Sequence, residues 1–352
     1  MESQAPEPLL LKDYRPASRL DTRRTEVTRP RFPVIDAHNH LGPEFGDWLA
    51  LPVGNLLSRL DEAGVRVYVD LDGGWGEDIL QSHLDHFKAP APERFRAFGG
   101  VDWSAWESQG DHFGEWAASR LRAQVARGAD GLKIWKNLGL SVRDHRGELV
   151  KVDDPRLDPI WATAGELKVP VTIHVADPVA FFEPLDAHNE RWEELTHHPD
   201  WHFPSPPYPS FTSIVNSLAA VVERHPGTTF IGAHVGCYAE NLTWVGAWMD
   251  RCPNFYIDIS ARISELGRQP YTARKFFIRY ADRILFGTDS GPSLDMYRRY
   301  YRFLETDDEY FNYSPGEIPP QGRWCVYGLY LPEDVLAKVY YQNAAHLLNL
   351  TW

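Results

Sequence analysis

The sequence predicts an α/β protein and, within that class, a closed (β/α)8 barrel with long loops after its fifth and eighth strands. The chain has 352 residues, enough for one such barrel of about 250 residues with insertions. Short runs rich in β-branched residues alternate with stretches in which apolar residues recur every three or four positions. Alternation of this kind indicates parallel strands joined by helical crossovers.

Eight runs have the length and composition of buried parallel strands, and each ends in a polar or small residue. They are Pro33–Asp36, Val65–Leu71, Arg96–Val101, Gly131–Trp135, Val169–His174, Thr228–His234, Phe255–Ser260 and Arg283–Gly287. Eight alternations match the closed TIM barrel. An open, doubly wound sheet is the alternative, but no run is followed by the GxGxxG or P-loop pattern that usually marks ligand binding in such sheets.

Helical patterns lie between these runs. The clearest sets of apolar residues are Leu56, Leu57 and Leu60; Phe113, Trp116, Ala117, Leu121 and Val125; and Ile214, Leu218, Val221 and Val222. Gly64, Gly128 and Gly227 stand where such a helix would stop before the next strand. Pro332, with two acidic residues after it, predicts the start of a final helix that runs through Leu348.

The chain divides into an N-terminal arm, residues 1–32, and one catalytic domain, residues 33–352. The arm shows no sustained periodicity, so we expect it to lie across the domain surface. Two connections, residues 176–209 and roughly 291–330, are too long for simple turns. Both follow strand ends, so in a barrel both would lie over the C-terminal face, where long structureless connections usually serve as lids or binding loops. The aromatic residues of the first connection suit a cover over a ligand.

The composition excludes several classes of partner. There are 36 Lys and Arg against 49 Asp and Glu, and the net charge of −13 argues against nucleic-acid binding. No stretch of about 18 apolar residues exists, so we expect no membrane span. The 3 cysteines are too few for a disulfide scaffold, and we see no secretory signal, so we expect a cytoplasmic protein. A small-molecule substrate and a homo-oligomer of the chain are compatible with this composition.

Four of the predicted strand ends carry residue types that bind metals. The first run continues into a His-Asn-His motif, in which His38 and His40 project to the same side of the strand. His174 closes the fifth run, His234 closes the sixth and Asp289 follows the eighth. Because barrel closure brings the eighth strand beside the first, these residues converge at one mouth. Imidazole and carboxylate together suit zinc and its neighbours.

This combination resembles the amidohydrolase superfamily, whose pattern is HxH on the first strand, His on the fifth and sixth, and Gly-Thr-Asp on the eighth. It looks most similar to the amidohydrolase-2 branch, which contains amino-carboxymuconate-semialdehyde decarboxylase and related metal-dependent hydrolases and decarboxylases. The resemblance covers roughly residues 32–350 and includes Asn343-Ala344 in the last helix. It implies a (β/α)8 barrel with a metal at its mouth.

The resemblance also implies roles for the individual residues. His38, His40, His174 and Asp289 would bind one divalent ion, zinc or manganese in most members. His234 would lie beside the ion and polarise the substrate. The chemistry agrees, because three imidazoles and one carboxylate leave an open position for a water whose pKa the metal lowers. Asp289 would both contact the ion and accept the proton of that water.

Four further residues are weaker candidates for the site. Lys133 corresponds to a lysine that is carboxylated and bridges two metals in binuclear relatives, although we favour a lysine that pairs with a carboxylate inside the barrel or points outward. Trp135 shares the face of Lys133 and would wall the pocket or pack in the core. Arg262 would hold a substrate carboxylate or pair with Asp258 at the rim. Arg191, in the long connection after the fifth strand, suits a clamp on an acidic substrate.

We expect a metal-dependent hydrolase in which an activated water attacks an ester, lactone or amide carbonyl of a small acidic or aromatic substrate. Non-oxidative decarboxylation of an aromatic or unsaturated acid is the alternative, because the same residues would seat a carboxylate and protonate the carbon that loses carbon dioxide. An inactive barrel that acts as a binding scaffold is a third interpretation. The complete set of ligand residues argues against that third interpretation.

Overall fold

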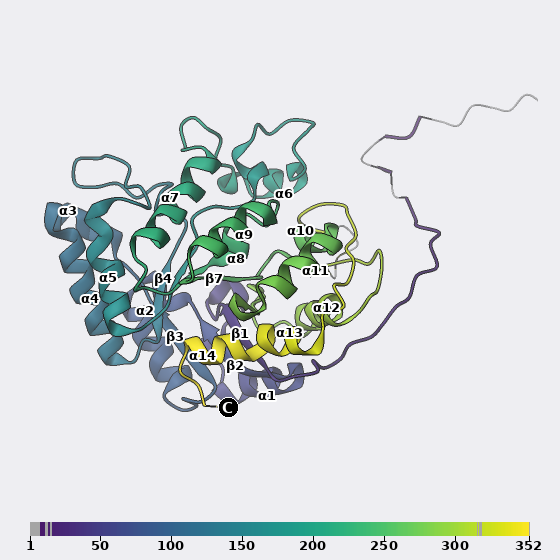
Figure 1. Ribbon diagram of the computed structural model, residues 1–352, viewed down its shortest axis with the longest axis horizontal. Helices are drawn as coiled ribbons and strands as arrows, with labels where there is room; N and C mark the ends of the chain where they lie inside the picture. Colours follow the sequence, from purple (N-terminus) through teal and green to yellow (C-terminus); the bar gives the residue numbers. More distant parts are fainter. Residues whose placement is uncertain (1–7, 11–12, 15, 315, 317–318, 352) are drawn as a thin grey trace, which may run out of the picture.

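The computed structural model describes residues 8–10, 13–14, 16–314, 316 and 319–351, and its centre is one parallel sheet (Figure 1). Within these residues the sheet has eight strands in the order of the sequence, each paired with the next. The strands are β1 (Val34–Asn39), β2 (Val65–Asp70), β3 (Phe95–Gly99), β4 (Gly131–Ile134), β5 (Val171–Ile173), β6 (Phe230–Gly232), β7 (Phe255–Asp258) and β8 (Ile284–Leu285). The predicted (β/α)8 barrel is confirmed.

The barrel is closed between β1 and the residues that follow β8. The main-chain N–H of Ala37 donates to the carbonyl of Phe286 at 2.9 Å, and that of Asp289 donates to the carbonyl of His38 at 3.0 Å. Between these two bonds lies Gly287, where a β-carbon would come within 2.9 Å of the β-carbon of His38. The close approach of the two strands therefore requires a residue without a side chain.

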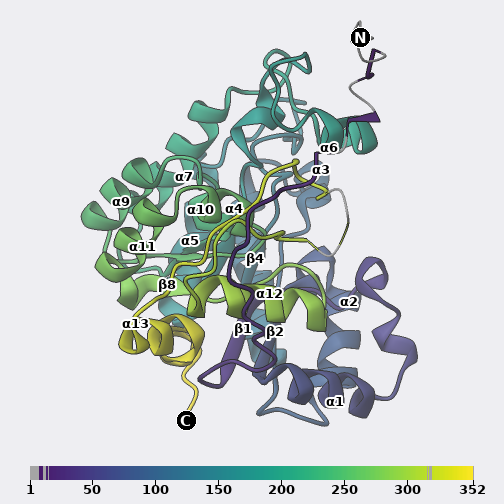
Figure 2. The ribbon, with the colours of Figure 1, turned by 90° about the vertical axis from the view of Figure 1, so that its right-hand side faces the viewer.

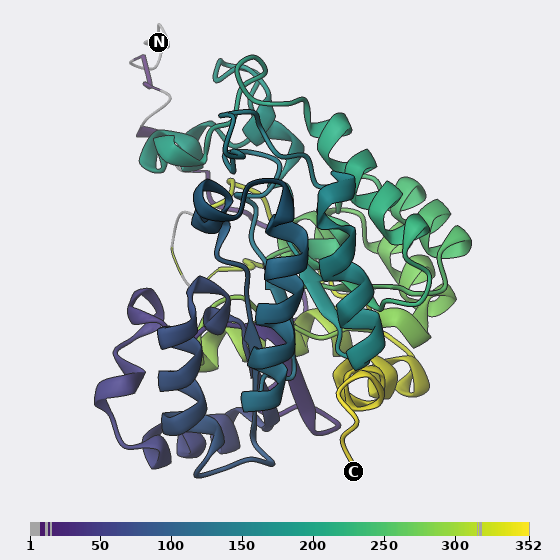
Figure 3. The ribbon, with the colours of Figure 1, turned by 90° about the vertical axis from the view of Figure 1, so that its left-hand side faces the viewer.

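Helices surround the sheet. They are α1 (Val53–Ala63), α2 (Glu77–His83), α3 (Trp106–Gln109), α4 (Phe113–Arg127), α5 (Asp158–Leu167), α6 (Trp192–His197), α7 (Phe211–Arg224), α8 (Ala233–Gly236), α9 (Leu242–Arg251), α10 (Ile263–Arg268), α11 (Pro270–Arg279), α12 (Leu294–Glu305), α13 (Glu333–Ala337) and α14 (Asn343–Leu347). Figure 3 shows α4 and α5 side by side on one flank, where Arg122 of α4 pairs with Glu166 of α5. In the described part of the chain, no helix has the length and apolar character needed to cross a bilayer.

Two of the three glycines that were predicted to end helices do so. Gly64 ends α1 with φ 79° and Gly128 ends α4 with φ 117°, a left-handed conformation that favours glycine. The third prediction is wrong, because α7 stops before His225 and Gly227 lies further on, in the turn that leads to β6. The predicted final helix is present as α13 and α14, which a wider π-helical turn, Lys338–Gln342, joins into one stretch.

A separate cluster of small and branched side chains fills the interior of the barrel away from the site. It includes Ile35 of β1, Val67 of β2, Ile231 of β6 and Leu285 of β8, together with Ala344 of α14. Because these strands lie on different sides of the barrel, their contact must cross its interior. The cluster therefore gives the strands a packed base, and the mouth of the barrel is left to the polar residues at the strand ends.

The two long connections are folded, which corrects the expectation that they are structureless. Residues 176–209 contain the short helix α6 and two 3-10 turns, Val179–Phe182 and Pro199–Trp201. Residues 291–330 contain the whole of α12, and the described residues between α12 and α13, within 306–332, form no further helix. The sequence of α12 does carry a helical pattern: Tyr297, Tyr300, Tyr301 and Leu304 are buried. Their aromatic character and the charged residues between them obscured that pattern.

These two segments contact each other above the barrel. Arg323 of the later segment binds both carboxylate oxygens of Glu193, at 2.7 and 2.6 Å. The ring of Trp324 lies 5.5 Å from the guanidinium of Arg191. Figure 1 shows the segment that carries α6 at the top of the molecule, the end away from α1 and α14, and Figure 2 shows the same arrangement from the side.

The described part of the N-terminal arm crosses the surface of the domain, as Figure 2 shows. The N–H of Thr25 donates to Asp308 at 2.6 Å, and that of Arg31 donates to Glu305 at 3.1 Å. The arm is therefore bound to the end of α12 and to the start of residues 306–332. Residues 1–7, 11–12 and 15 of the predicted arm lie outside the described residues.

Replacing Gly287 by alanine should lower the free energy of unfolding by about 1–3 kcal/mol, because the added methyl group must displace the main chain of β1 beside His38. Urea unfolding followed by circular dichroism measures the change. Gly227→Ala is the matched control, because a β-carbon at Gly227 meets nothing within 4 Å. Equal stability of the two variants would show that barrel closure does not depend on the missing side chain.

Candidate metal centre

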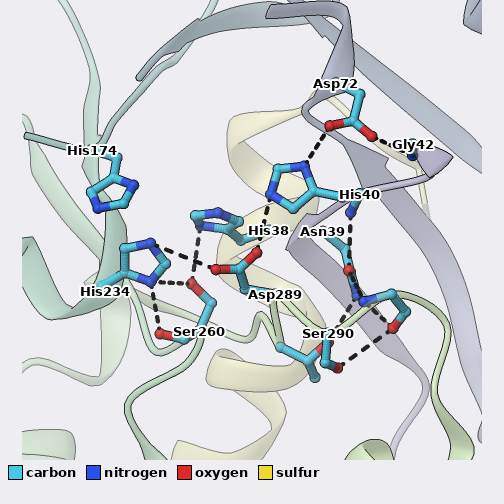
Figure 4. Close-up of polar contacts among 12 residues, drawn as sticks. His38, Asn39, His40, Gly42, Asp72, His174, His234, Ser260, Asp289 and Ser290 are labelled. Atoms are coloured by element: carbon cyan, nitrogen blue, oxygen red, sulfur yellow. Dashed lines mark hydrogen bonds and ion pairs between the residues drawn. The ribbon is translucent and has the colours of Figure 1, made fainter. Parts of the chain in front are cut away.

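The ends of β1, β5, β6 and β8 bring four histidines and one aspartate together at the barrel mouth (Figure 4). His38, His40 and Asp289 form a compact group, with one ligand atom from each lying within 4.8 Å of the others. His234 lies beside them, its ring centroid 4.8 Å from that of His38. The ring of His174 lies 4.4 Å from that of His234.

Both histidines of the His-Asn-His motif are oriented by carboxylates. The Nδ1 of His38 donates to Asp258 Oδ2 at 2.8 Å, and the Nδ1 of His40 donates to Asp72 Oδ1 at 2.8 Å. In the neutral rings the hydrogen is then on Nδ1, and Nε2 offers a free electron pair. Metal-binding histidines have this carboxylate–imidazole arrangement, so the two rings are set up to bind a cation through Nε2.

The closest contact at the centre is between His40 and Asp289, whose Nε2 and Oδ1 atoms lie 3.1 Å apart (Figure 4). Burial alone would lower the pKa of His40, but the hydrogen bonds to Asp289 and Asp72 outweigh it and raise the pKa to about 9. Without a metal, a proton therefore occupies the space between these two atoms. His40 and Asp289 would both be ligands of a divalent cation, and its binding would release that proton.

His234 has a fixed hydrogen-bond arrangement. Its Nδ1 donates to the carbonyl of Ser260 at 2.9 Å, and its main-chain N–H donates to Asp258 Oδ1 at 3.1 Å. A carbonyl can only accept, so Nδ1 carries the hydrogen and the free electron pair of Nε2 lies 3.8 Å from Asp289 Oδ2. Burial holds the pKa of His234 well below its usual value, so the ring is neutral. The left-handed φ of 56° at His234 turns the ring into the mouth directly after β6.

His174 is the predicted ligand that the structure does not place in the compact group. Its buried Nε2 makes no hydrogen bond within the described residues, although Asp177 Oδ1 lies 3.4 Å away. Burial lowers the pKa of His174 to about 4, so the ring is neutral. A buried imidazole nitrogen without a partner is the kind of group that a metal ion would satisfy. Its role as a ligand stays a prediction.

The donor set as a whole fits a divalent ion. Neutral imidazole nitrogens and one carboxylate are ligands that zinc and manganese accept. The Nε2 of His40 lies 3.1 Å from Asp289, that of His38 belongs to the same compact group, and that of His174 makes no hydrogen bond within the described residues. The side chain of Asp289 is 23% exposed, which leaves the centre open to solvent on one side.

Asn39, between the two histidines, fixes the strand that carries them. Its Nδ2 donates to Asp36 Oδ2 at 2.7 Å and to Thr288 Oγ1 at 2.8 Å. Its Oδ1 accepts from the N–H of His40 at 2.9 Å and from that of Gly291 at 2.8 Å (Figure 4). The motif therefore directs its histidines to the centre and uses its asparagine to tie β1 to the turn after β8.

Sequence reasoning missed two of the supporting residues. Asp72 orients His40, and Ser260 holds His234 through its carbonyl. Their positions in the sequence could have indicated them, because each lies two residues after an aspartate that ends a strand. These aspartates are Asp70 in β2 and Asp258 in β7. Neither residue type is diagnostic alone, since Asp and Ser are common at strand ends.

The weaker candidates Lys133 and Trp135 both lie at the centre. The Nζ of Lys133 is 3.3 Å from His38 Nε2, and burial lowers the pKa of Lys133 to about 8. No carboxylate of the described residues forms an ion pair with it, contrary to the interpretation that we favoured. Trp135 stacks on His40 at a centroid distance of 5.2 Å and on Trp75 at 4.0 Å. The bridging role of Lys133 and substrate contact by Trp135 stay predictions.

Arg191 is placed differently from the prediction. It is only 1% exposed, its Nη1 binds Glu194 Oε2 at 2.8 Å, and its Nη2 binds Glu265 of α10. Two buried carboxylates already compensate its charge, so it joins the segment of residues 176–209 to α10 and is not free to clamp a substrate. The aromatic residues of that segment also differ from the expectation: Phe181 and Phe182 are buried in the apolar core.

Arg262 forms no ion pair with Asp258, which instead binds His38 and Ser260. This excludes the rim ion pair as an explanation for Arg262 among the described contacts.

Comparison with known proteins identifies a family and a fold to which the chain is similar. Residues 35–350 match the profile of a protein family described as amidohydrolase. No curated protein matches the chain. One similar solved structure is 2,6-dihydroxybenzoate decarboxylase complexed with 2,6-dihydroxybenzoate, with 18% identity, a TM-score of 0.54, and coverage of 91% of this chain and 100% of that chain.

Two further solved structures have the same fold. Dihydroxybenzoic acid decarboxylase from Polaromonas sp. JS666, with bound manganese and the inhibitor 2-nitroresorcinol, has 18% identity and a TM-score of 0.54 over 90% of this chain and 97% of that chain. An amidohydrolase from Burkholderia multivorans with bound HEPES has 14% identity and a TM-score of 0.51 over 90% of this chain and 99% of that chain. At these identities the likeness shows the fold.

Replacing His38 or Asp289 by alanine should remove most of the bound divalent ion, because each supplies a ligand atom of the compact group. His174→Ala should also lower the ion content if its unpartnered nitrogen is a ligand. Elemental analysis after loading with zinc or manganese and dialysis gives the content per chain. His202→Ala, whose ring bonds to the carbonyl of Glu183, is the control and should keep the ion. Full ion content in His38→Ala and Asp289→Ala would contradict the site.

Asp72→Asn should weaken metal affinity by about 10- to 100-fold while leaving the fold intact, because Asp72 orients His40 without reaching the centre. Competition with a chromogenic chelator measures the affinity. Asp154→Asn, which alters an aspartate bound to Arg156 and in contact with no histidine of the site, serves as the control. A loss of affinity that is the same in both variants would assign the effect to general electrostatics.

Proposed function

Because the chain belongs to the amidohydrolase family, we propose that it is a metal-dependent enzyme that removes the carboxyl group of a small aromatic or unsaturated acid without oxidation. Members of this family bind a divalent metal. Two of the similar solved structures are decarboxylases of dihydroxybenzoic acids, which supports the choice of reaction class. Hydrolysis of an ester, lactone or amide is the alternative within the same family.

The observation that carries this proposal is the placement of Asp289 between two imidazoles in a buried centre. Its Oδ1 lies 3.1 Å from His40 and its Oδ2 lies 3.8 Å from His234. The side chains of His38, His40 and His234 are almost fully buried, so solvent reaches this group mainly at Asp289. Asp289 is the member of the group that solvent can reach, and it can therefore collect a proton and carry it inward.

The residues of the site would act at different steps of the reaction. His38, His40 and Asp289 would hold a divalent ion, which would supply Lewis-acid stabilisation of the oxygen atoms of the substrate. The bond between the ring carbon and the carboxylate breaks, carbon dioxide leaves, and the bonding electron pair remains on the ring carbon. Asp289 delivers a proton to that carbon, having taken it from a substrate hydroxyl or from solvent. Trp135, stacked on His40, limits the position of a flat ring.

The tautomer of His234 favours decarboxylation over hydrolysis. A hydrolase needs a hydrogen-bond donor for the oxyanion that forms when water adds to a carbonyl. In its neutral form His234 presents an electron pair at Nε2, because the hydrogen on Nδ1 is donated to the carbonyl of Ser260. His234 is therefore better suited to accept a proton from a substrate hydroxyl than to stabilise an oxyanion.

The proposal predicts release of carbon dioxide from an aromatic acid by the zinc- or manganese-loaded protein. We expect at least one acid from a panel of aromatic mono- and dicarboxylic acids to lose carbon dioxide and, in deuterium oxide, to gain one deuterium at the vacated carbon. Asp289→Asn should lower turnover per bound metal by about 10²- to 10⁴-fold, since the proton carrier is lost. Gas analysis and proton NMR give the two readouts. Hydrolysis across a panel of lactones and esters, with no carbon dioxide from any acid, would assign the enzyme to the hydrolases.

A further inference from the structure

Arg262 is a buried cation for which the described residues supply no counter-charge. It directly precedes α10 and lies two positions after Ser260. The carbonyl of Ser260 accepts the hydrogen bond from His234 Nδ1. Arg262 is only 5% exposed. The Nη1 donates to the carbonyl of Ala261 at 3.0 Å, and no carboxylate of the described residues lies within 4.0 Å of the guanidinium. A carbonyl satisfies one N–H and leaves the charge uncompensated.

Arg191 shows how this protein treats a buried guanidinium elsewhere. Arg191 is 1% exposed, and its two terminal nitrogens bind Glu194 and Glu265. Removing a charge from water is costly unless an opposite charge is bound in its place. The pairing of Arg191 meets that requirement within the chain. Among the described residues Arg262 has no such partner, so we infer that its opposite charge comes from a molecule that binds beside it.

Arg262 lies beside the metal centre, because the main-chain N–H of the preceding residue, Ala261, donates at 3.3 Å to the carbonyl of Thr288, one residue before Asp289. Burial is the main reason why the pKa of His234 is low, and the positive charge of Arg262 acts in the same direction. The same charge lowers the pKa of Cys237, just beyond His234, although burial outweighs it. Glu194 also experiences this charge, but its carboxylate is bonded to Arg191. An anion in contact with Arg262 would therefore lie beside His234, at the edge of the proposed substrate site.

We propose that Arg262 binds an anionic group of the substrate, a carboxylate, and thereby selects organic acids at this centre. The proposal rests on the proposed function in one respect only, that the metal centre is the place of reaction. A guanidinium presents two parallel N–H groups that match the two oxygens of a carboxylate. The surface charge of −13 does not oppose such recognition, because the anion is bound in a local, buried environment.

The carboxylate held by Arg262 is the one that the reaction leaves in place. A carboxylate bound to a guanidinium is stabilised as an anion, and this binding is lost if the group departs as neutral carbon dioxide. Strong binding of the departing group would therefore raise the barrier. For decarboxylation the substrate class is then a dicarboxylic acid, with one carboxylate at the metal and the other on Arg262. For hydrolysis it is an acid with one ester, lactone or amide group.

The test compares two ligands that differ in a single charge. Isophthalate has two carboxylates on a benzene ring, and 3-carbamoylbenzoate has a neutral amide of the same shape in place of one of them. We expect the zinc- or manganese-loaded protein to bind isophthalate roughly 10- to 100-fold more tightly, as measured by calorimetric titration. Arg262→Gln should reduce this preference to less than about twofold, and Arg262→Lys should restore part of it.

Arg268→Gln is the matched control, because Arg268 lies on the same helix and pairs with Glu190 near the surface. It should keep the preference for isophthalate. Metal content and thermal unfolding establish that each variant is folded and loaded. The proposal is overturned if the wild-type protein binds neither ligand at millimolar concentration, if it binds both equally, if Arg262→Gln keeps the preference, or if Arg268→Gln loses it to the same extent. The assay measures binding alone, so a failure of decarboxylation leaves its outcome unaffected.

Discussion

The contact between the first and last strands of the barrel is the constraint on which the site depends. Gly287 lies against the β-carbon of His38, and the N–H of Asp289 donates to the carbonyl of His38. These contacts bring the carboxylate that follows β8 to the imidazoles of β1. Asn39 strengthens the same junction through Asp36 and Thr288. A change that separated these strands would alter the spacing of the ligand atoms before it exposed any apolar core.

A second layer of charged residues determines what the histidines can do. Asp258 and Asp72 each hold an Nδ1 atom, and the carbonyl of Ser260 holds a third. Carboxylates thus accept the Nδ1 hydrogen bonds of His38 and His40, whereas a neutral carbonyl accepts that of His234. The rings held by carboxylates are well suited to bind a cation, and the ring held by a carbonyl is better suited to proton transfer.

The barrel and its converging ligand residues could be predicted because they depend on local patterns. Parallel strands covered on both sides appear as short apolar runs, and a polar residue at the end of such a run marks the mouth. The helix α12 was missed because its buried face is built of Tyr297, Tyr300 and Tyr301, which are not diagnostic of a helix. The pairing of Arg191 with Glu265 could not be predicted, because the two residues are 74 positions apart in sequence and only the folded chain brings them together.

Barrel closure also determines when the site comes into existence. Asp36 and Thr288 are bonded to each other although they are 252 residues apart, and the ligand residues beside them are separated to a similar degree. A ribosome delivers the histidines of β1 long before it delivers Asp289. During most of synthesis the nascent chain therefore holds only a fraction of the donors, and stable capture of an ion has to follow release of the nearly complete domain. Metal loading is then a late step that depends on the ion supply around the finished protein.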